Sequence, residues 1–154
     1  MKHVWSILCQ NSIIDSDTNS LSLYNCLAQL VIDIDKNTVT SNETGFNIPV
    51  QYDLVSFWID EEIAKERGFF VEIDLVDPSN KKLGTTTNNY TLIKGTRRLR
   101  SRIKTQGISI TTEGRYWFKV KMKEKKNEKF KQVAELPLDV KINYKLLDTK
   151  NNSK

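Results

Sequence analysis

The side chains that most often carry out chemistry in proteins are sparse in this chain of 154 residues. Its single histidine is His3, and the sequence contains no Gly-x-Ser-x-Gly elbow, no phosphate-binding glycine loop and no dinucleotide-binding motif. A histidine-based mechanism needs a second group that orients the imidazole, and nothing beside His3 supplies one. We therefore expect a protein that is not an enzyme and that carries no cofactor and no metal.

Two cysteines and two acidic pairs are the remaining candidates for a redox or metal site. Cys9 and Cys26 lie symmetrically about residues 17–18, so a hairpin centred there brings the two thiols close together. A zinc site needs further ligands at close spacing, and none follow, which favours two structural thiols over a metal site. Closure of the pair by oxidation is the alternative. The acidic pairs 15/17 and 33/35 lack the spacing of a calcium-binding loop and are typical of turns.

A run of cations is the strongest candidate for a binding surface. Residues 94–104 contain six basic side chains in eleven positions, and lysines also crowd residues 121–131. Basic side chains beside an aromatic ring are typical of surfaces that bind phosphates and stack bases. The candidate anion- or partner-binding residues are Arg97, Arg98, Arg100, Arg102, Lys104, Trp117, Lys121 and Lys123.

Charge is also divided unequally along the chain. Residues 1–77 carry 4 basic and 13 acidic side chains, whereas residues 78–154 carry 20 basic and 6 acidic ones. A polarised chain of this kind favours a partner of opposite charge, or contact between copies of the protein. The alternative is that acidic side chains neutralise the basic ones within one domain. The acidic candidates for such pairing include Asp33, Asp35, Glu72 and Asp74.

Period-two alternation of apolar and polar residues predicts the strands that must position these side chains. The clearest strand spans 115–123. The other predicted strands span 4–14, 20–34, 48–59, 69–75, 97–111 and 134–142. These make about seven strands, the number typical of a β-sandwich.

Two features interrupt the strands. Pro137 cannot donate a ladder hydrogen bond, so it predicts a sheet edge or a bulge in the last strand. One short connecting helix is predicted over 60–67, because Asp60 can cap it and Gly68 can end it.

One hairpin is predicted in detail. A loop at residues 112–114 would join two paired strands, with a bulge at Gly107 that keeps their apolar faces aligned. That register sets two pairs of like charges opposite one another, Lys104 with Lys121 and Arg102 with Lys123. Like charges opposed across a ladder destabilise it, so we expect a bound anion, solvent or acidic side chains to neutralise them.

Taken in order, the segments 7–15, 19–25, 70–78 and 114–118 resemble a family of small uncharacterised bacterial proteins with an immunoglobulin-like β-sandwich. The resemblance extends over roughly the first 120 residues and consists of hydrophobic pattern and turns. It implies the fold, and it implies no activity and no functional residues.

The expected architecture is therefore all-β, a single immunoglobulin-like antiparallel β-sandwich over 1–147 with a polar C-terminal tail at 148–154. No apolar run has the length of a membrane span, and no signal-peptide cleavage site follows residues 1–8, so a cytoplasmic location is expected. The expected function is a non-enzymatic binding or assembly module. It would recognise a partner protein, or a copy of itself, through charged faces and sheet edges. The alternative is a domain that binds nucleic acid or another polyanion with the basic strands 94–104 and 115–125.

Overall fold

The computed structural model describes residues 1–35 and 45–145, so the predicted tail at 148–154 lies outside the described residues. In these two ranges the chain forms strands and connecting loops and no helix. The strands are β1 (Lys2–Ile14), β2 (Leu21–Cys26), β3 (Gln29–Asp35), β4 (Phe46–Ile59), β5 (Arg67–Val76), β6 (Lys82–Leu92), β7 (Arg98–Ile110), β8 (Gly114–Lys123) and β9 (Lys131–Lys145).

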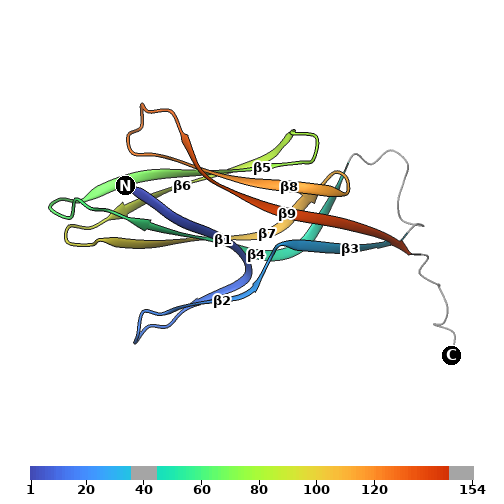
Figure 1. Cartoon of the computed structure of the whole chain (residues 1–154), viewed down its shortest axis with the longest axis horizontal. Helices are drawn as coiled ribbons and strands as arrows, with labels where there is room; N and C mark the ends of the chain where they lie inside the picture. Colours follow the sequence, from blue (N-terminus) through green and yellow to red (C-terminus); the bar gives the residue numbers. More distant parts are fainter. Residues whose placement is uncertain (36–44, 146–154) are drawn as a thin grey trace.

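The strands form two sheets that pack as an elongated sandwich (Figure 1). Sheet A has the order β2-β1-β4-β7, and sheet B has the order β3-β9-β8-β5-β6. The described ladders are antiparallel except for β3 and β9, which run parallel. The all-β prediction is confirmed at the level of a two-sheet sandwich.

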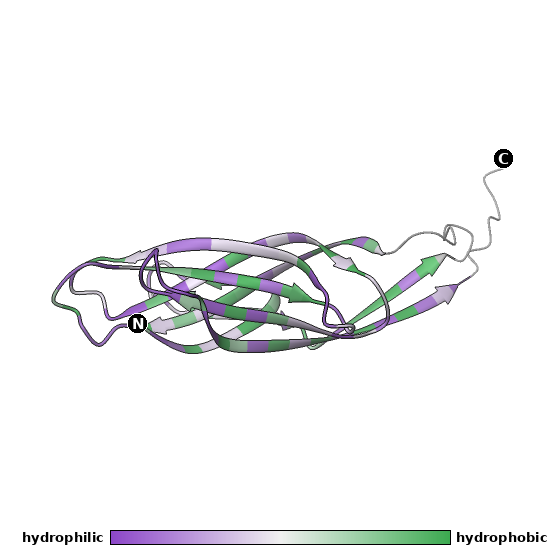
Figure 2. Ribbon diagram, turned by 90° about the horizontal axis from the view of Figure 1, so that it is seen from above, coloured by the Kyte–Doolittle hydropathy of each residue, from purple (hydrophilic) through white to green (hydrophobic). Residues whose placement is uncertain are grey.

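The core lies between the sheets because the strands alternate apolar and polar side chains, as the colours along the ribbon show (Figure 2). Large aromatic side chains fill its centre. Trp58 of β4 packs on Phe69 of β5 with ring centroids 5.0 Å apart, and Tyr52 packs edge-on against Phe118 at 5.6 Å. The buried indole nitrogen of Trp58 donates a hydrogen bond to Ser101 Oγ at 2.8 Å.

The predicted hairpin at 112–114 is wrong, because this segment is an arch between the two sheets. β7 pairs with β4 in sheet A, whereas β8 pairs with β5 and β9 in sheet B. An arch and a hairpin bury the same alternating faces, so the apolar pattern did not distinguish them. Gly107 has φ +88° and lies at a bulge, but the bulge interrupts the β4–β7 ladder.

The phenol of Tyr116 holds this arch. Its hydroxyl accepts hydrogen bonds from the backbone N–H groups of Thr111 at 2.8 Å and Thr112 at 3.0 Å, and it donates to the Thr112 carbonyl at 2.7 Å. The ring itself is fully buried. The turn is therefore fixed by a side chain of the following strand.

The short helix predicted over 60–67 is absent, and the segment is a loop with a turn. Asp60 Oδ1 accepts a hydrogen bond from the N–H of Glu62 at 3.1 Å, and it also binds the guanidinium of Arg67 at 3.1 Å. The carbonyl of Ile63 accepts the N–H of Gly95 at 3.0 Å. In a helix the carbonyl of Ile63 would accept a hydrogen bond from the N–H four residues later. Here it accepts one from the loop that contains Gly95, so the helical hydrogen bond does not form.

The predicted strand over 20–34 divides into β2 and β3, which belong to different sheets. Asn25 has φ +51°, and the chain crosses between the sheets just after it. Strand β6 was missed because its threonine- and asparagine-rich sequence lacks apolar alternation. Pro137 lies inside β9, at a place where β3 has not yet begun to pair, since the parallel ladder starts at Asp139. On the side of β9 that faces β3, Pro137 therefore lies at a local sheet edge, where its missing N–H breaks no ladder hydrogen bond.

Candidate binding surface on sheet A

The predicted basic residues divide between the two outer faces of the sandwich. Arg98, Arg100, Arg102 and Lys104 alternate along β7 and project from sheet A, and Arg97 lies in the loop that leads into this strand. Trp117, Lys121 and Lys123 project from sheet B, on β8. The two sets share no surface, so a groove that uses both strands does not form. The like-charge pairs of the predicted hairpin do not form either.

The cations of sheet B are neutralised within the fold. Lys121 Nζ lies 3.1 Å from Glu72 Oε1 and also binds Asp74 across the β5–β8 ladder. The hydrogen bond to Asp74 raises the pKa of Lys121 above its ordinary value. Burial opposes ionisation of Asp74, but hydrogen bonds from Lys121 and Thr85 outweigh it and lower the pKa of Asp74. On this face, basic and acidic side chains pair within the domain, which is the alternative that the sequence left open.

The other cations of β8 are also occupied. Lys119 Nζ lies 3.8 Å from Glu135 Oε1. Lys123 Nζ lies over the rings of Phe70 and Phe130, 5.5 and 4.7 Å from their centroids. A cation over aromatic faces gains part of the stabilisation that a counter-charge would give.

The cations of sheet A differ from these. In the described part of the chain, no carboxylate lies within ion-pairing distance of any of the five basic residues of 97–104. Their neighbours across the ladder on β4 are mostly apolar, since Arg100 faces Phe57 and Arg102 faces Val55. Lys104 faces Asp53, which is buried and accepts a hydrogen bond from Ser12 Oγ. A row of uncompensated positive charge therefore follows β7.

The β1–β2 hairpin folds back over the outer face of sheet A. In Figure 1 the N-terminal strand bends near the middle of the molecule, and the hairpin returns toward the end at which the chain starts. Arg102 Nη1 donates a hydrogen bond to the Ser12 carbonyl at 2.8 Å and so fixes the hairpin to β7. Val55, on the outer face of β4, is only 1% exposed because the hairpin covers it. Residues 52–58 of β4 are consequently buried or half-buried on both faces.

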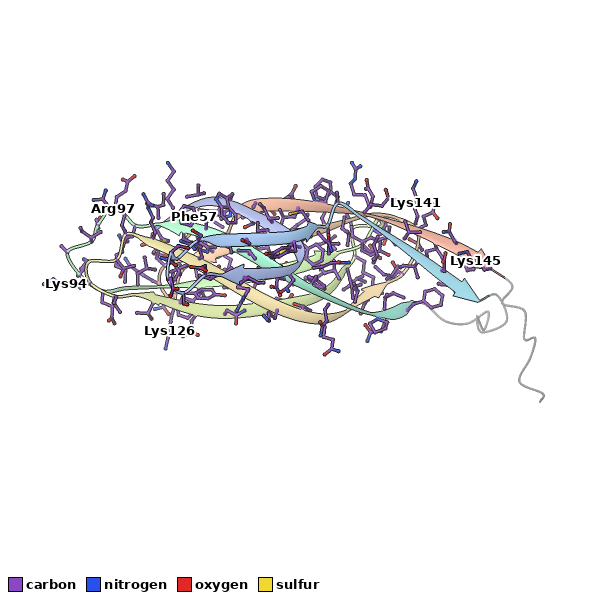
Figure 3. All side chains as sticks on the ribbon, turned by 90° about the horizontal axis from the view of Figure 1, so that it is seen from below. Phe57, Lys94, Arg97, Lys126, Lys141 and Lys145 are labelled. Carbon is purple, nitrogen blue, oxygen red and sulfur yellow. The ribbon has the colours of Figure 1, made fainter. Side chains whose placement is uncertain are left out.

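A groove separates the tip of this hairpin from sheet A. Its floor is the stacked pair Trp5 and Phe57, with ring centroids 5.6 Å apart, and Leu23 of β2 forms part of its wall. Arg98 and Arg100 also line it, and Arg100 Nη1 is buried without a hydrogen-bond partner among the described residues. Phe57 and Arg97 lie at the same end of the molecule, and Lys141 and Lys145 lie at the other end (Figure 3). This end of sheet A combines aromatic surface with unpaired guanidinium groups.

A cavity of about 210 Å³ opens between the sheets beside β7. It is lined by side chains of both sheets, among them Leu75 and Leu83 from sheet B and Ile103 from sheet A. Strands β6 and β7 are edge strands of their respective sheets, so the cavity lies at the open side of the sandwich.

The cysteines lie where the sequence placed them. Cys9 and Cys26 face one another across the β1–β2 ladder, and both are free thiols. Cys9 is buried, and burial, followed by the nearby charge of Asp53, raises its pKa. A thiol of this kind is poorly reactive.

The single histidine is packed against the core. His3 Nε2 lies 2.7 Å from Ser6 Oγ, and the ring packs edge-on against Trp58. Burial lowers its pKa. Among residues 1–35 and 45–145, no group of three or more His, Cys, Asp or Glu residues is arranged to hold a metal ion. In the same ranges no helix has the length and apolar character needed to cross a membrane.

The sequence prediction missed Trp5 and Phe57, and although it predicted the hairpin that pairs Cys9 with Cys26, it missed that this hairpin covers sheet A. A signal for both was present in residues 54–59, Leu-Val-Ser-Phe-Trp-Ile, where apolar side chains run almost without interruption. A strand of that composition is buried on both faces, so something must cover its outer side.

Comparison with known proteins adds no family to this description. No protein-family model matches the chain, and no curated protein matches it in sequence.

Proposed function

We propose that this protein is a non-enzymatic binding module, and that the outer face of sheet A along β7 recognises an acidic segment of a partner protein. The observation that carries the proposal is the contrast between the two faces. The cations of β8 are satisfied by Glu72, Asp74, Glu135 and aromatic rings, whereas those of 97–104 have no carboxylate within ion-pairing distance in the described chain. Self-repulsion along such a row costs stability, and an acidic partner removes that cost.

An acidic protein segment fits this surface better than a nucleic acid does. The basic row lies on an edge strand, whose free backbone N–H and C=O groups match an extended peptide. A nucleic acid would gain most from aromatic platforms beside the cations. Trp117 lies on the opposite face, and the groove over Trp5 and Phe57 is lined by Arg98 and Arg100 but by no other cation of the row.

The finer fold type that we propose is immunoglobulin-like. Strands β1, β4 and β7 follow the order of strands A, B and E of that fold, and β9, β8 and β5 follow the order of G, F and C. The hydroxyl of Tyr116 bonds to the backbone a few residues upstream at the start of β8, which corresponds to the tyrosine corner before strand F. A reducing, cytoplasmic setting is supported by the two free thiols that face one another on β1 and β2.

The test is a binding titration followed by fluorescence anisotropy at several salt concentrations, with labelled poly-glutamate and labelled single- and double-stranded DNA. The variant Arg98→Glu/Lys104→Glu reverses two exposed charges of the basic row and leaves Arg102, which holds the hairpin, in place. Its matched control, Lys126→Glu/Lys129→Glu, makes the same change of charge in the exposed loop between β8 and β9.

We expect poly-glutamate to bind more tightly than DNA, and the sheet A variant to lose at least about tenfold, since a hydrogen bond to a charged group contributes about 1.5–3 kcal/mol. The control should bind as the wild type does. Tighter binding of DNA that depends on Arg98 and Lys104 would replace the proposal with the polyanion alternative. Equal losses in both variants would show that overall charge, and no specific surface, controls binding.

A further inference from the structure

The open side of the sandwich indicates how an acidic segment would bind, and this inference rests on the proposed function. We infer that the partner segment adds to β7 as an extra strand along residues 103–109. Its acidic side chains would face the basic row on the outer side, and its apolar side chains would enter the cavity between β6 and β7.

The first argument is the accessible edge of β7. In sheet A this strand pairs with β4 on one side, and among the described strands none pairs with it on the other. The two sheet edges approach each other near Tyr90 of β6 and Ser101 of β7. Beyond that contact, residues of β7 from Ile103 to Ser109 line the cavity. An added strand therefore has room along the second half of β7.

The second argument is the size of the cavity. Its volume is about 210 Å³. An apolar cavity of about 150 Å³ in another protein holds benzene, whereas sites for drug-sized ligands measure about 300–1,000 Å³. The space is thus suited to one or two apolar side chains and is small for a larger metabolite.

Gly84 leaves open space on the cavity side of β6. It pairs with Leu75 across the β5–β6 ladder, and a Cβ added to it would meet no atom within 4 Å. Its φ is not positive, so the backbone does not require glycine there. The missing side chain leaves Leu83 and Ile103 half-buried at the rim of the cavity. The free protein therefore lacks apolar contacts at this glycine, and a side chain of the partner could supply them.

The third argument is the alternation of β7 itself. Arg102 and Lys104 point outward, whereas Ile103 and Thr105 face the cavity side. Residues directly opposite one another on neighbouring strands interact, and opposite charges there stabilise the pair. A partner strand that alternates acidic and apolar residues would match both faces at once. Pairing of β7 with β7 of a second copy would set cation against cation, which disfavours that form of self-association.

The test uses two labelled octapeptides of identical composition, four repeats of Glu-Ile and the block sequence of four Glu followed by four Ile. Both carry the same charge, but only the first presents acidic and apolar faces as a strand. We expect wild-type protein to bind the alternating peptide at least about tenfold more tightly. The amide protons of residues 103–109 should become protected from hydrogen exchange in the complex.

The variant Gly84→Val fills the cavity, and it should fold at least as stably as the wild type because valine favours strands. It should lose the preference for the alternating peptide and retain the weaker binding that depends on charge. The control Thr87→Val places the same side chain on β6 away from the cavity, and it should keep the preference.

Three results would overturn the inference. They are equal binding of the two peptides by wild-type protein, an unchanged preference in Gly84→Val, and the absence of protection along residues 103–109. In each case charge-dependent binding of both peptides would leave the proposed function standing. If neither peptide binds, the proposed function fails together with the inference.

Discussion

The arch between the sheets depends on one hydroxyl group, so we expect Tyr116→Phe to destabilise the fold measurably. The substitution removes a single oxygen atom and keeps the ring, which is fully buried. No cavity larger than that atom forms, so the loss reports on hydrogen bonds and only weakly on packing.

The magnitude follows from three backbone hydrogen bonds, two accepted from Thr111 and Thr112 and one donated to the Thr112 carbonyl. A net contribution of about 0.5–1.5 kcal/mol for each gives about 1.5–4.5 kcal/mol. Thr112 is exposed, so water can replace its two bonds in part, and Thr111 is half-buried. We therefore expect a loss of about 2 kcal/mol in the free energy of unfolding, or about 4–8 °C in Tm for a chain of this size.

Urea denaturation followed by tryptophan fluorescence measures this loss. The dependence of the unfolding free energy on urea should not change, because the buried surface is the same. Tyr24→Phe is the matched control, since Tyr24 is 49% exposed and should lose almost nothing. A loss below about 0.5 kcal/mol in Tyr116→Phe would refute the reasoning, because it would mean that water supplies the arch with all three bonds.

Two further predictions concern titratable groups. Under native conditions the exposed thiol of Cys26 should react with iodoacetamide, whereas Cys9 should react only in denaturant. The reason is that burial and the charge of Asp53 raise the pKa of Cys9. Mass spectrometry that shows equal labelling of both thiols in the native protein would contradict this. Burial opposes ionisation of Asp77, but hydrogen bonds from Ser79, Lys81 and Thr111 outweigh it and lower the pKa of Asp77. The contribution of this carboxylate to stability is therefore complete above the pKa of about 3.9 of an unfolded aspartate. It is lost as the pH falls through the lowered pKa of the folded state. Urea midpoints of wild type and Asp77→Asn should therefore differ at neutral pH and converge in acid, and a gap that stays constant would argue against this role of the carboxylate.

The inward-facing residues of the sandwich were predictable from alternation, and their pairing was not. Ile110 and Tyr116 lie on the apolar faces of the predicted strands 97–111 and 115–123, and both are buried. The short-range signals around Gly114 fit a hairpin and an arch equally well. The choice between them depends on β4 and β5, which lie far from this turn in the sequence and supply the ladders that β7 and β8 join.

The candidate site was predictable in composition and not in geometry. The basic residues of 97–104 were identified, but their isolation from acidic side chains depends on which strand lies beside β7. Lys121 finds Glu72 and Asp74 because β5 pairs with β8, whereas Arg102 faces Val55 because β4 pairs with β7. Net charge along a sequence cannot distinguish these two outcomes, since it contains no information on neighbours across a sheet.

The parallel pairing of β3 with β9 has a consequence for how the protein is made. Asp33 meets Asn143, which is 110 residues later in the chain. At a synthesis rate of about 5–20 residues per second, β3 would wait about 5–20 s before its partner strand leaves the ribosome. During that time the exposed Val31 and the apolar residues beside it have no ladder to join. The newly made chain is consequently most exposed to misassembly at β3, the strand that waits longest for its ladder.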